Sequence, residues 1–181
     1  AFNWAEGREN VVIPWEIGGV PVTAIGAYAF SASGIVSLIA PQTVKTIGDG
    51  AFINCPSLTS VSLPQAQTVG YEAFSGCTSL TSVSLPQVQT VGGYAFAGCC
   101  SLTSVSLPQA TAIGANAFDY CPSLASLSLP KATSIGNNAF ADCALLTAVH
   151  MGRNAPAEAS YVFAGITPPP TVYVTDPQAT G

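Results

Sequence analysis

The sequence predicts a solenoid in which 22-residue units stack on one another, with a parallel β-sheet on one face and short turns or 3-10 segments on the other. Two observations predict this fold class. First, near-identical stretches follow one another without a gap, such as IGDGAFINCPSLTSVSLPQAQT from Ile47 and VGYEAFSGCTSLTSVSLPQVQT from Val69. Second, an Ile-Gly or Val-Gly pair opens every unit at a constant spacing of 22 residues, at Ile25, Ile47, Val69, Val91, Ile113 and Ile135.

Each unit contains one segment with strand spacing. Val61 and Leu63 alternate with Ser60 and Ser62, so the apolar pair is expected to face inward and the serines outward. Pro64 then limits further pairing. The Ala-Phe pair is expected in a short helical or irregular turn with its Phe inward. One aromatic column is therefore predicted, made of Phe30, Phe52, Phe74, Phe96, Phe118 and Phe140.

The two ends differ from the repeats, as the ends of a solenoid must. We predict an N-terminal cap over residues 1–24, six 22-residue repeats over 25–152 and a C-terminal cap over 153–181, all within one domain. The Gly18-Gly19 pair is expected in a turn, and Val172-Tyr173-Val174 in a last strand. The first repeat departs from the pattern, with Ser33 in place of Cys, and its strand edge is expected to be locally irregular.

Composition and charge limit the possible partners. Hydrophobic residues make up 49% of the chain and charged residues 7%, and the formal net charge is -5. Four basic residues are too few to follow a phosphate backbone, so a nucleic-acid partner is not expected. No apolar run reaches the roughly 18 residues of a membrane span, so insertion into a membrane is not expected either. No cofactor is implied.

Five of the six cysteines occupy one repeat column: Cys55, Cys77, Cys99, Cys121 and Cys143. An inward column makes Cys a small core hydrophobe, so buried free thiols are expected. Distance does not exclude a disulfide between adjacent units, although the stacking direction disfavours its torsion. A metal site is not expected, because the thiols occur one per unit rather than in pairs. Cys100 is expected nearer the surface, where it could be oxidised or link two molecules.

The outward face of the predicted sheet is the natural binding surface of a solenoid. The candidate ligand-binding residues there are two columns of hydroxyls, Ser60, Ser82, Ser104 and Ser126, then Ser62, Ser84, Ser106 and Ser128. The alternative is a sheet face that is merely solvated. The column after the proline adds Gln65, Gln87, Gln109, Lys131 and Arg153. Together with His150, Lys131 and Arg153 are candidates for an anion-accepting corner. The alternative is pairing with Glu158 or Asp176.

Catalysis is disfavoured, although Ser128 and His150 fall in one column on adjacent units. A Ser-His pair also needs a carboxylate that orients the His and a site that stabilises an oxyanion. Asp142 belongs to the same unit as His150 but lies on the far turn, and no G-x-S-x-G segment occurs. No catalytic residue is assigned.

The consensus I-G-x-x-A-F-x-x-C-x-x-L-x-x-V-x-L-P resembles that of the BspA-like leucine-rich repeat family, over roughly residues 10 to 175. The front segment from Val12 to Phe30 also looks like the opening of that family. The resemblance implies a leucine-rich-repeat solenoid of a bacterial secreted or cell-surface protein, active in adhesion to host or microbial proteins or glycans. It carries over no catalytic residues. The alternatives are a passive structural spacer of a larger surface protein and, more remotely, a hydrolase that uses His150.

Overall fold

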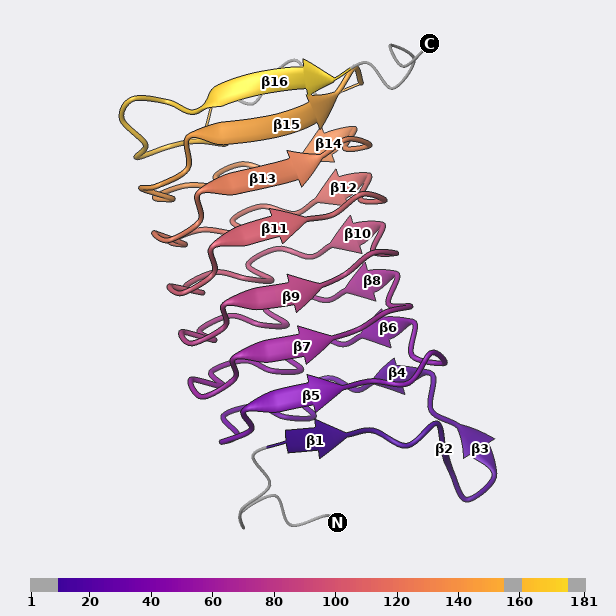
Figure 1. Cartoon of the computed structure of the whole chain (residues 1–181). Coiled ribbons are helices and arrows are strands. Elements are labelled where there is room, and N and C mark those ends of the chain that lie inside the picture. Colours follow the sequence, from indigo (N-terminus) through magenta and orange to yellow (C-terminus); the bar gives the residue numbers. More distant parts are fainter. Residues whose placement is uncertain (1–9, 155–160, 176–181) are drawn as a thin grey trace.

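The computed structural model describes residues 10–154 and 161–175, which form one stack of repeat layers with no helix among them (Figure 1). We call each layer a rung. No helix in these two ranges is long and apolar enough to cross a membrane. Eight strands line one side of the stack: β1 (Asn10–Val12), β5 (Ser37–Ile39), β7 (Ser60–Ser62), β9 (Ser82–Ser84), β11 (Ser104–Ser106), β13 (Ser126–Leu129), β15 (Ala148–Gly152) and β16 (Thr171–Thr175).

The strands on this side pair in parallel and in register, as the repeat predicts. Ser60 lies opposite Ser82, and Ser104 lies opposite Ser126. The side divides into two four-stranded sheets, β1-β5-β7-β9 and β11-β13-β15-β16. Between them, the Thr103 N–H still donates to the Thr81 carbonyl, at 3.5 Å. The expected sheet is therefore present in two segments.

A second, continuous sheet follows the neighbouring side of the stack. Its six strands have two residues each: β4 (Ala24–Ile25), β6 (Thr46–Ile47), β8 (Thr68–Val69), β10 (Thr90–Val91), β12 (Ala112–Ile113) and β14 (Ser134–Ile135). In each strand the first residue points outward, while the second faces the core. The continuity of this sheet holds the rungs in one stack where the longer strands are divided.

The core is organised around the predicted phenylalanine column. Adjacent rings from Phe30 to Phe140 lie 4.9 to 5.4 Å apart between centroids and are nearly parallel. Phe163 extends the column at 5.9 Å from Phe140. The rings between the ends, including Phe52 and Phe96, are fully buried. The prediction that residues of one column become spatial neighbours is confirmed.

The third side of each rung consists of short turns, one of the two forms expected there, and no 3-10 helix is present in the described residues. Two residues per rung adopt positive φ, for example Asn116 (56°) and Tyr120 (53°) around Phe118. A left-handed residue cannot continue a right-handed helical turn, so each turn ends after one hydrogen bond within the rung. The intervening N–H groups donate to the next rung instead, as Phe96 does to the Ala117 carbonyl at 2.7 Å.

The predicted elements at the two ends are present. Gly18 and Gly19 both have positive φ, 62° and 81°, and form the turn of a hairpin between β2 (Glu16–Ile17) and β3 (Val20–Pro21). This is the conformation that a two-residue hairpin turn requires. β16 contains the predicted last strand and pairs in parallel with β15.

The irregularity expected at the strand of the first repeat is absent. β5 keeps its register with both β1 and β7. Compared with the other repeats, this one lacks a residue before Ile35 and has an extra one after Pro41. The extra residue lies in the turn after Pro41, where the hydroxyl of Thr43 is buried without a hydrogen-bond partner. The turn therefore absorbs the change in length and leaves the strand undisturbed.

Removing one ring from the middle of the phenylalanine column tests how far the stack depends on it. We expect Phe96→Ala to lower the free energy of unfolding by about 3–5 kcal/mol, because it leaves a ring-sized cavity between two stacked neighbours. Urea denaturation followed by circular dichroism measures the loss. Leu145→Ala, at an exposed position, is the control and should cost little. A loss below about 1 kcal/mol for Phe96→Ala would contradict a packed column.

Candidate functional site

The eight predicted serines form a regular outward face, which we call the serine face. Ser60, Ser62, Ser82, Ser84, Ser104, Ser106 and Ser126 are exposed, and Ser128 is partly exposed. Their register makes two straight columns in each sheet segment. With a spacing of about 4.8 Å between neighbouring strands, the face presents a periodic array of hydroxyls. It carries hydrogen-bond donors and acceptors without any charge.

Aromatic and apolar side chains limit the serine face at its two ends. At one end, Val12 and Ile39 lie in register with Ser62 and are exposed. At the other end, His150 and Tyr173 continue the column of Ser128. Their rings stack with centroids 5.0 Å apart and planes 15° from parallel. The sequence reasoning included His150 but missed Tyr173. Alignment of Val172-Tyr173-Val174 with the strand around His150 would have identified it.

Glutamines of the column after the proline accept hydrogen bonds from lysines of neighbouring rungs. Lys131 donates from Nζ to Gln109 Oε1 at 2.6 Å, and Lys45 donates to Gln65 Oε1 at 3.1 Å. Lys131 therefore reaches toward the preceding rung, whereas His150 stacks on the following one. The anion-accepting corner of Lys131, His150 and Arg153 stays a prediction. The alternative partners Glu158 and Asp176 lie outside the described residues.

The arrangement around His150 does not resemble a hydrolytic site. Ser128 and His150 are opposite each other on β13 and β15, as expected. However, the imidazole faces the ring of Tyr173. Asp142 lies in the turn before Cys143, where its N–H donates to the Ala164 carbonyl. Within 10–154 and 161–175, no group of three or more His, Cys, Asp or Glu side chains is placed to hold a metal ion.

The cysteine column is buried, as predicted, and its thiols are free. Each thiol donates to the carbonyl of the phenylalanine in the preceding rung. These distances are 2.9 Å from Cys55 to Phe30 and 3.1 to 3.2 Å for the four pairs that follow. The carbonyls of Phe30, Phe74 and Phe96 also accept a backbone N–H within their own rung, so the thiol adds a second hydrogen bond to a buried acceptor there. The column is therefore a hydrogen-bonded element of the fold rather than a reactive centre.

The two kinds of cysteine differ in environment. Burial raises the pKa of the Cys99 thiol far above its ordinary value of 9.0. Removal from water disfavours the charged thiolate, and the thiolate is the nucleophilic form. Cys100 is partly exposed, as predicted, and its thiol donates to the Gly98 carbonyl at 3.3 Å.

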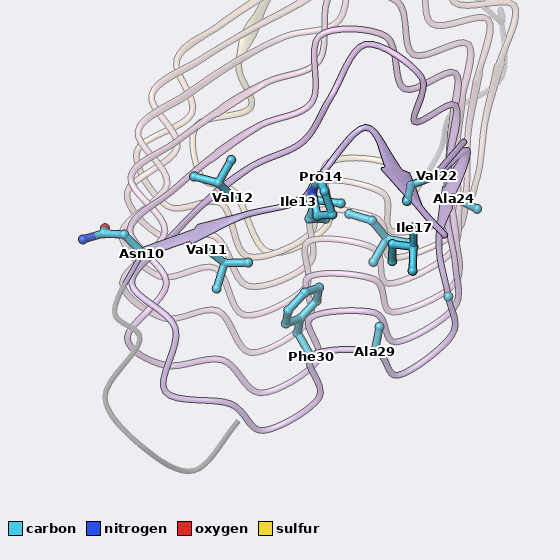
Figure 2. A pocket seen from close by; sticks show the side chains of 12 residues that line it. Asn10, Val11, Val12, Ile13, Pro14, Ile17, Val22, Ala24, Ala29 and Phe30 are labelled. Atoms are coloured by element: carbon cyan, nitrogen blue, oxygen red, sulfur yellow. The ribbon is translucent and has the colours of Figure 1, made fainter. Parts of the chain in front are cut away.

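A cavity of about 470 Å³ opens at the first rung (Figure 2). Figure 2 shows Val11 and Ile13 on one side of it and Phe30 and Ala29 on another. None of its twelve lining residues has a titratable side chain. The cavity is the open end of the hydrophobic core and holds no groups for acid–base or nucleophilic chemistry.

Three exposed tyrosines on the turn side were missed by the sequence reasoning, which considered only the strand face. Tyr28, Tyr71 and Tyr94 follow the short strands β4, β8 and β10. We call them the tyrosine strip. The signal was present in the sequence, because the three residues occupy two adjacent repeat columns directly after the Ile-Gly or Val-Gly pair.

Comparison with known proteins agrees with this architecture. Residues 1–121 and 111–172 match the family model described as the BspA type leucine rich repeat region, in six copies. No curated protein matches the chain.

Three solved structures illustrate the likeness to bacterial proteins. A leucine-rich repeat protein of T. pallidum is 32% identical, with a TM-score of 0.60, and the match covers 79% of this chain and 58% of that one. A leucine-rich cell surface protein of Faecalibacterium prausnitzii is 27% identical over 84% and 50%, with a TM-score of 0.65. A leucine-rich repeat protein of Bacteroides ovatus is 28% identical over 86% and 43%, with a TM-score of 0.69. The chain therefore spans roughly half the length of these relatives.

Thiol reactivity tests the assignment of the cysteines. In native protein we expect a thiol reagent such as 5,5′-dithiobis(2-nitrobenzoate) to modify Cys100 alone, because the other five thiols are buried. All six should react after denaturation in guanidinium chloride. Cys100→Ser should abolish the native reaction. Rapid native modification of a column cysteine in that variant would contradict a buried column.

The raised pKa of Cys99 predicts an alkaline loss of stability. The unfolded thiol ionises above its ordinary pKa of 9.0, whereas the folded thiol stays protonated. The contribution of Cys99 is therefore constant below that pH and falls above it, by up to about 1.4 kcal/mol per pH unit. Urea denaturation from pH 7 to 10.5 measures it. Cys99→Ala should be less stable at pH 7 and show a shallower decline. Equal slopes for the two proteins would contradict the burial argument.

Proposed function

The chain belongs to the BspA-type leucine-rich repeat family, and on that premise we propose that it is a non-enzymatic binding module of an extracellular or cell-surface protein. Its ligand is a protein or a glycan, bound through the serine face and the residues at its edges. The proposed role is adhesion to a host or microbial surface. The F. prausnitzii relative is described as a leucine-rich cell surface protein, which supports the proposed location at the cell surface.

The observation that carries this proposal is the in-register array of exposed hydroxyls on a rigid sheet. Ser62 and Ser84 lie opposite each other, as do Ser106 and Ser128. A sheet of this kind loses little conformational entropy on binding, because its backbone is already ordered. An extended partner with a regular spacing of polar groups can therefore bond to several rungs at once.

The ends of the serine face supply the contacts that hydroxyls lack. The stacked pair of His150 and Tyr173 offers a flat aromatic surface next to the Ser106–Ser128 column. Val12 and Ile39 offer apolar contact at the opposite end. Aromatic residues contribute disproportionately to binding energy in protein interfaces. The proposed interface thus combines a polar centre with apolar anchors near its ends.

Binding to immobilised matrix proteins and glycans tests the proposal. We expect the wild-type chain to bind at least one ligand specifically. Ser84→Arg with Ser106→Arg should weaken that binding at least tenfold, about 1.4 kcal/mol, because two long charged side chains would cover the hydroxyl array.

The matched control is Thr68→Arg with Thr90→Arg. These two threonines are also exposed and in register, but they lie on the short-strand sheet. The control should bind as the wild type does. Absence of specific binding by the wild type would contradict the proposal and favour a passive spacer. Equal losses in both double variants would place the ligand elsewhere on the chain.

A further inference from the structure

The tyrosine strip is a second exposed surface, separated from the serine face by the core. Tyr28, Tyr71 and Tyr94 are 60%, 48% and 37% exposed. The rings of Tyr71 and Tyr94 meet edge to face, with centroids 5.8 Å apart. The strip extends over four rungs, a length of about 14 Å at the spacing of paired strands. It is an elongated aromatic surface rather than a set of isolated side chains.

A glycine in the next rung lets the ring of Tyr28 rest on the backbone. A Cβ atom at Gly50 would collide with the ring of Tyr28, whereas one at Gly93 would make only ordinary van der Waals contact with Tyr71 Cδ2, at 3.5 Å. Gly50 also has positive φ, 57°, where glycine is least strained. The ring of Tyr28 therefore leans along the stack over Gly50, and its other side stays exposed to solvent.

Two of the three strip tyrosines, Tyr28 and Tyr94, are held in the left-handed backbone region at an energetic cost. Tyr28, Glu72 and Tyr94 occupy one repeat column and adopt φ of 56°, 53° and 55°. The left-handed region costs most residues roughly 1–2 kcal/mol, and least for Gly and Asn. The same column contains Gly50, Asn116 and Asn138 in the other rungs, so the fold itself does not require a large side chain there. Strain of this kind concentrates at functional sites.

Carboxylates lie beside the rings. Asp49 Oδ1 accepts a hydrogen bond from the Tyr71 N–H at 2.8 Å, which places this carboxylate between the rung of Tyr28 and that of Tyr71. Glu72 lies next to Tyr71. Desolvation raises the pKa of the Tyr71 hydroxyl, and a hydrogen bond to Glu72 and its negative charge raise that pKa further. The rim of the strip is therefore rich in hydrogen-bond acceptors.

We propose that the tyrosine strip is a binding site for an uncharged polysaccharide chain. The apolar C–H faces of pyranose rings fit exposed aromatic rings, while their hydroxyls donate to the carboxylates of Asp49 and Glu72. The length of the strip suits several sugar units rather than one. The net charge of -5 and the carboxylates at the rim disfavour an acidic polysaccharide.

The acceptors at the rim also distinguish a polysaccharide from a proline-rich peptide, which can bind aromatic surfaces too. The backbone of such a peptide offers mainly carbonyl acceptors, because proline has no N–H. The carboxylates of Asp49 and Glu72 would therefore find few donors on such a backbone. Sugar hydroxyls are both donors and acceptors and can satisfy the carboxylates.

Affinity electrophoresis in native gels tests the proposal, with soluble mixed-linkage β-glucan, xyloglucan and galactomannan as the probes. We expect at least one of them to retard the wild-type chain. Tyr71→Ala with Tyr94→Asn should reduce the apparent affinity at least tenfold. Tyr120→Asn is the matched control, because Tyr120 is 61% exposed and also has positive φ but is not part of the strip. It should be retarded as the wild type is.

A stability measurement separates lost binding from lost folding. Tyr28→Asn and Tyr94→Asn should not lower the melting temperature, because Asn tolerates the left-handed region better than Tyr does. The serine-face variant Ser84→Arg with Ser106→Arg should keep its retardation, so the two surfaces are tested independently. No retardation by any of the three probes, unchanged retardation of the strip variant, or an equal loss in Tyr120→Asn would overturn the proposal. Preferential binding of a polyproline peptide would also overturn it.

Discussion

The repeat layers of this molecule depend on the parallel pairing of each rung with the next, in most cases with its copy 22 residues away. The pairing is visible in the register of the strands and equally in the turns, where Phe52 donates to Ala73 and Phe74 to Ala95, both at 2.7 Å. Backbone groups buried in a stack must find partners, and an identical neighbour supplies them at each rung. The consequence is that each column favours a residue type that packs well against the same residue type in the neighbouring rungs.

This constraint explains the composition. Phenylalanine stacks on phenylalanine, and serine hydroxyls can bond to one another or to water. A column of like charges would instead place them about one strand spacing apart, which is unfavourable. A chain with only 7% charged residues is therefore the expected outcome of a near-exact repeat. The basic residues Lys45 and Lys131 have uncharged glutamines as partners in neighbouring rungs, consistent with the same constraint.

The sequence was sufficient to predict the features that recur in every rung, but not those that occur in only one place. The inward phenylalanines, the outward serines, the buried thiols and the Gly18-Gly19 turn all follow from column position. The stacking of His150 on Tyr173 involves residues that occur once, so it is absent from the repeat consensus and emerges only when the last strand is aligned with the strand around His150. The sequence left turns and 3-10 segments open for the third side, because side-chain periodicity does not report the left-handed conformations of residues such as Asn116 and Tyr120. The tyrosine strip depends on where a glycine replaces the larger side chain of the same column in the adjacent rung, as Gly50 does beside Tyr28, and such single-rung exceptions are lost in a repeat consensus.

The ladder of thiols and phenylalanine carbonyls has a consequence for how such a chain changes in length. The phenylalanine carbonyl of each rung accepts a hydrogen bond from the thiol of the next rung, as Phe30 does from Cys55. In the first repeat Ser33 takes the cysteine position, and its hydroxyl lies 3.4 Å from the Cys55 sulfur. Any junction between two such rungs therefore contains the same two groups, a cysteine thiol and a phenylalanine carbonyl. Unequal recombination that gains or loses a whole unit leaves a junction chemically equivalent to the original, so variants of different length can arise without any compensating substitution.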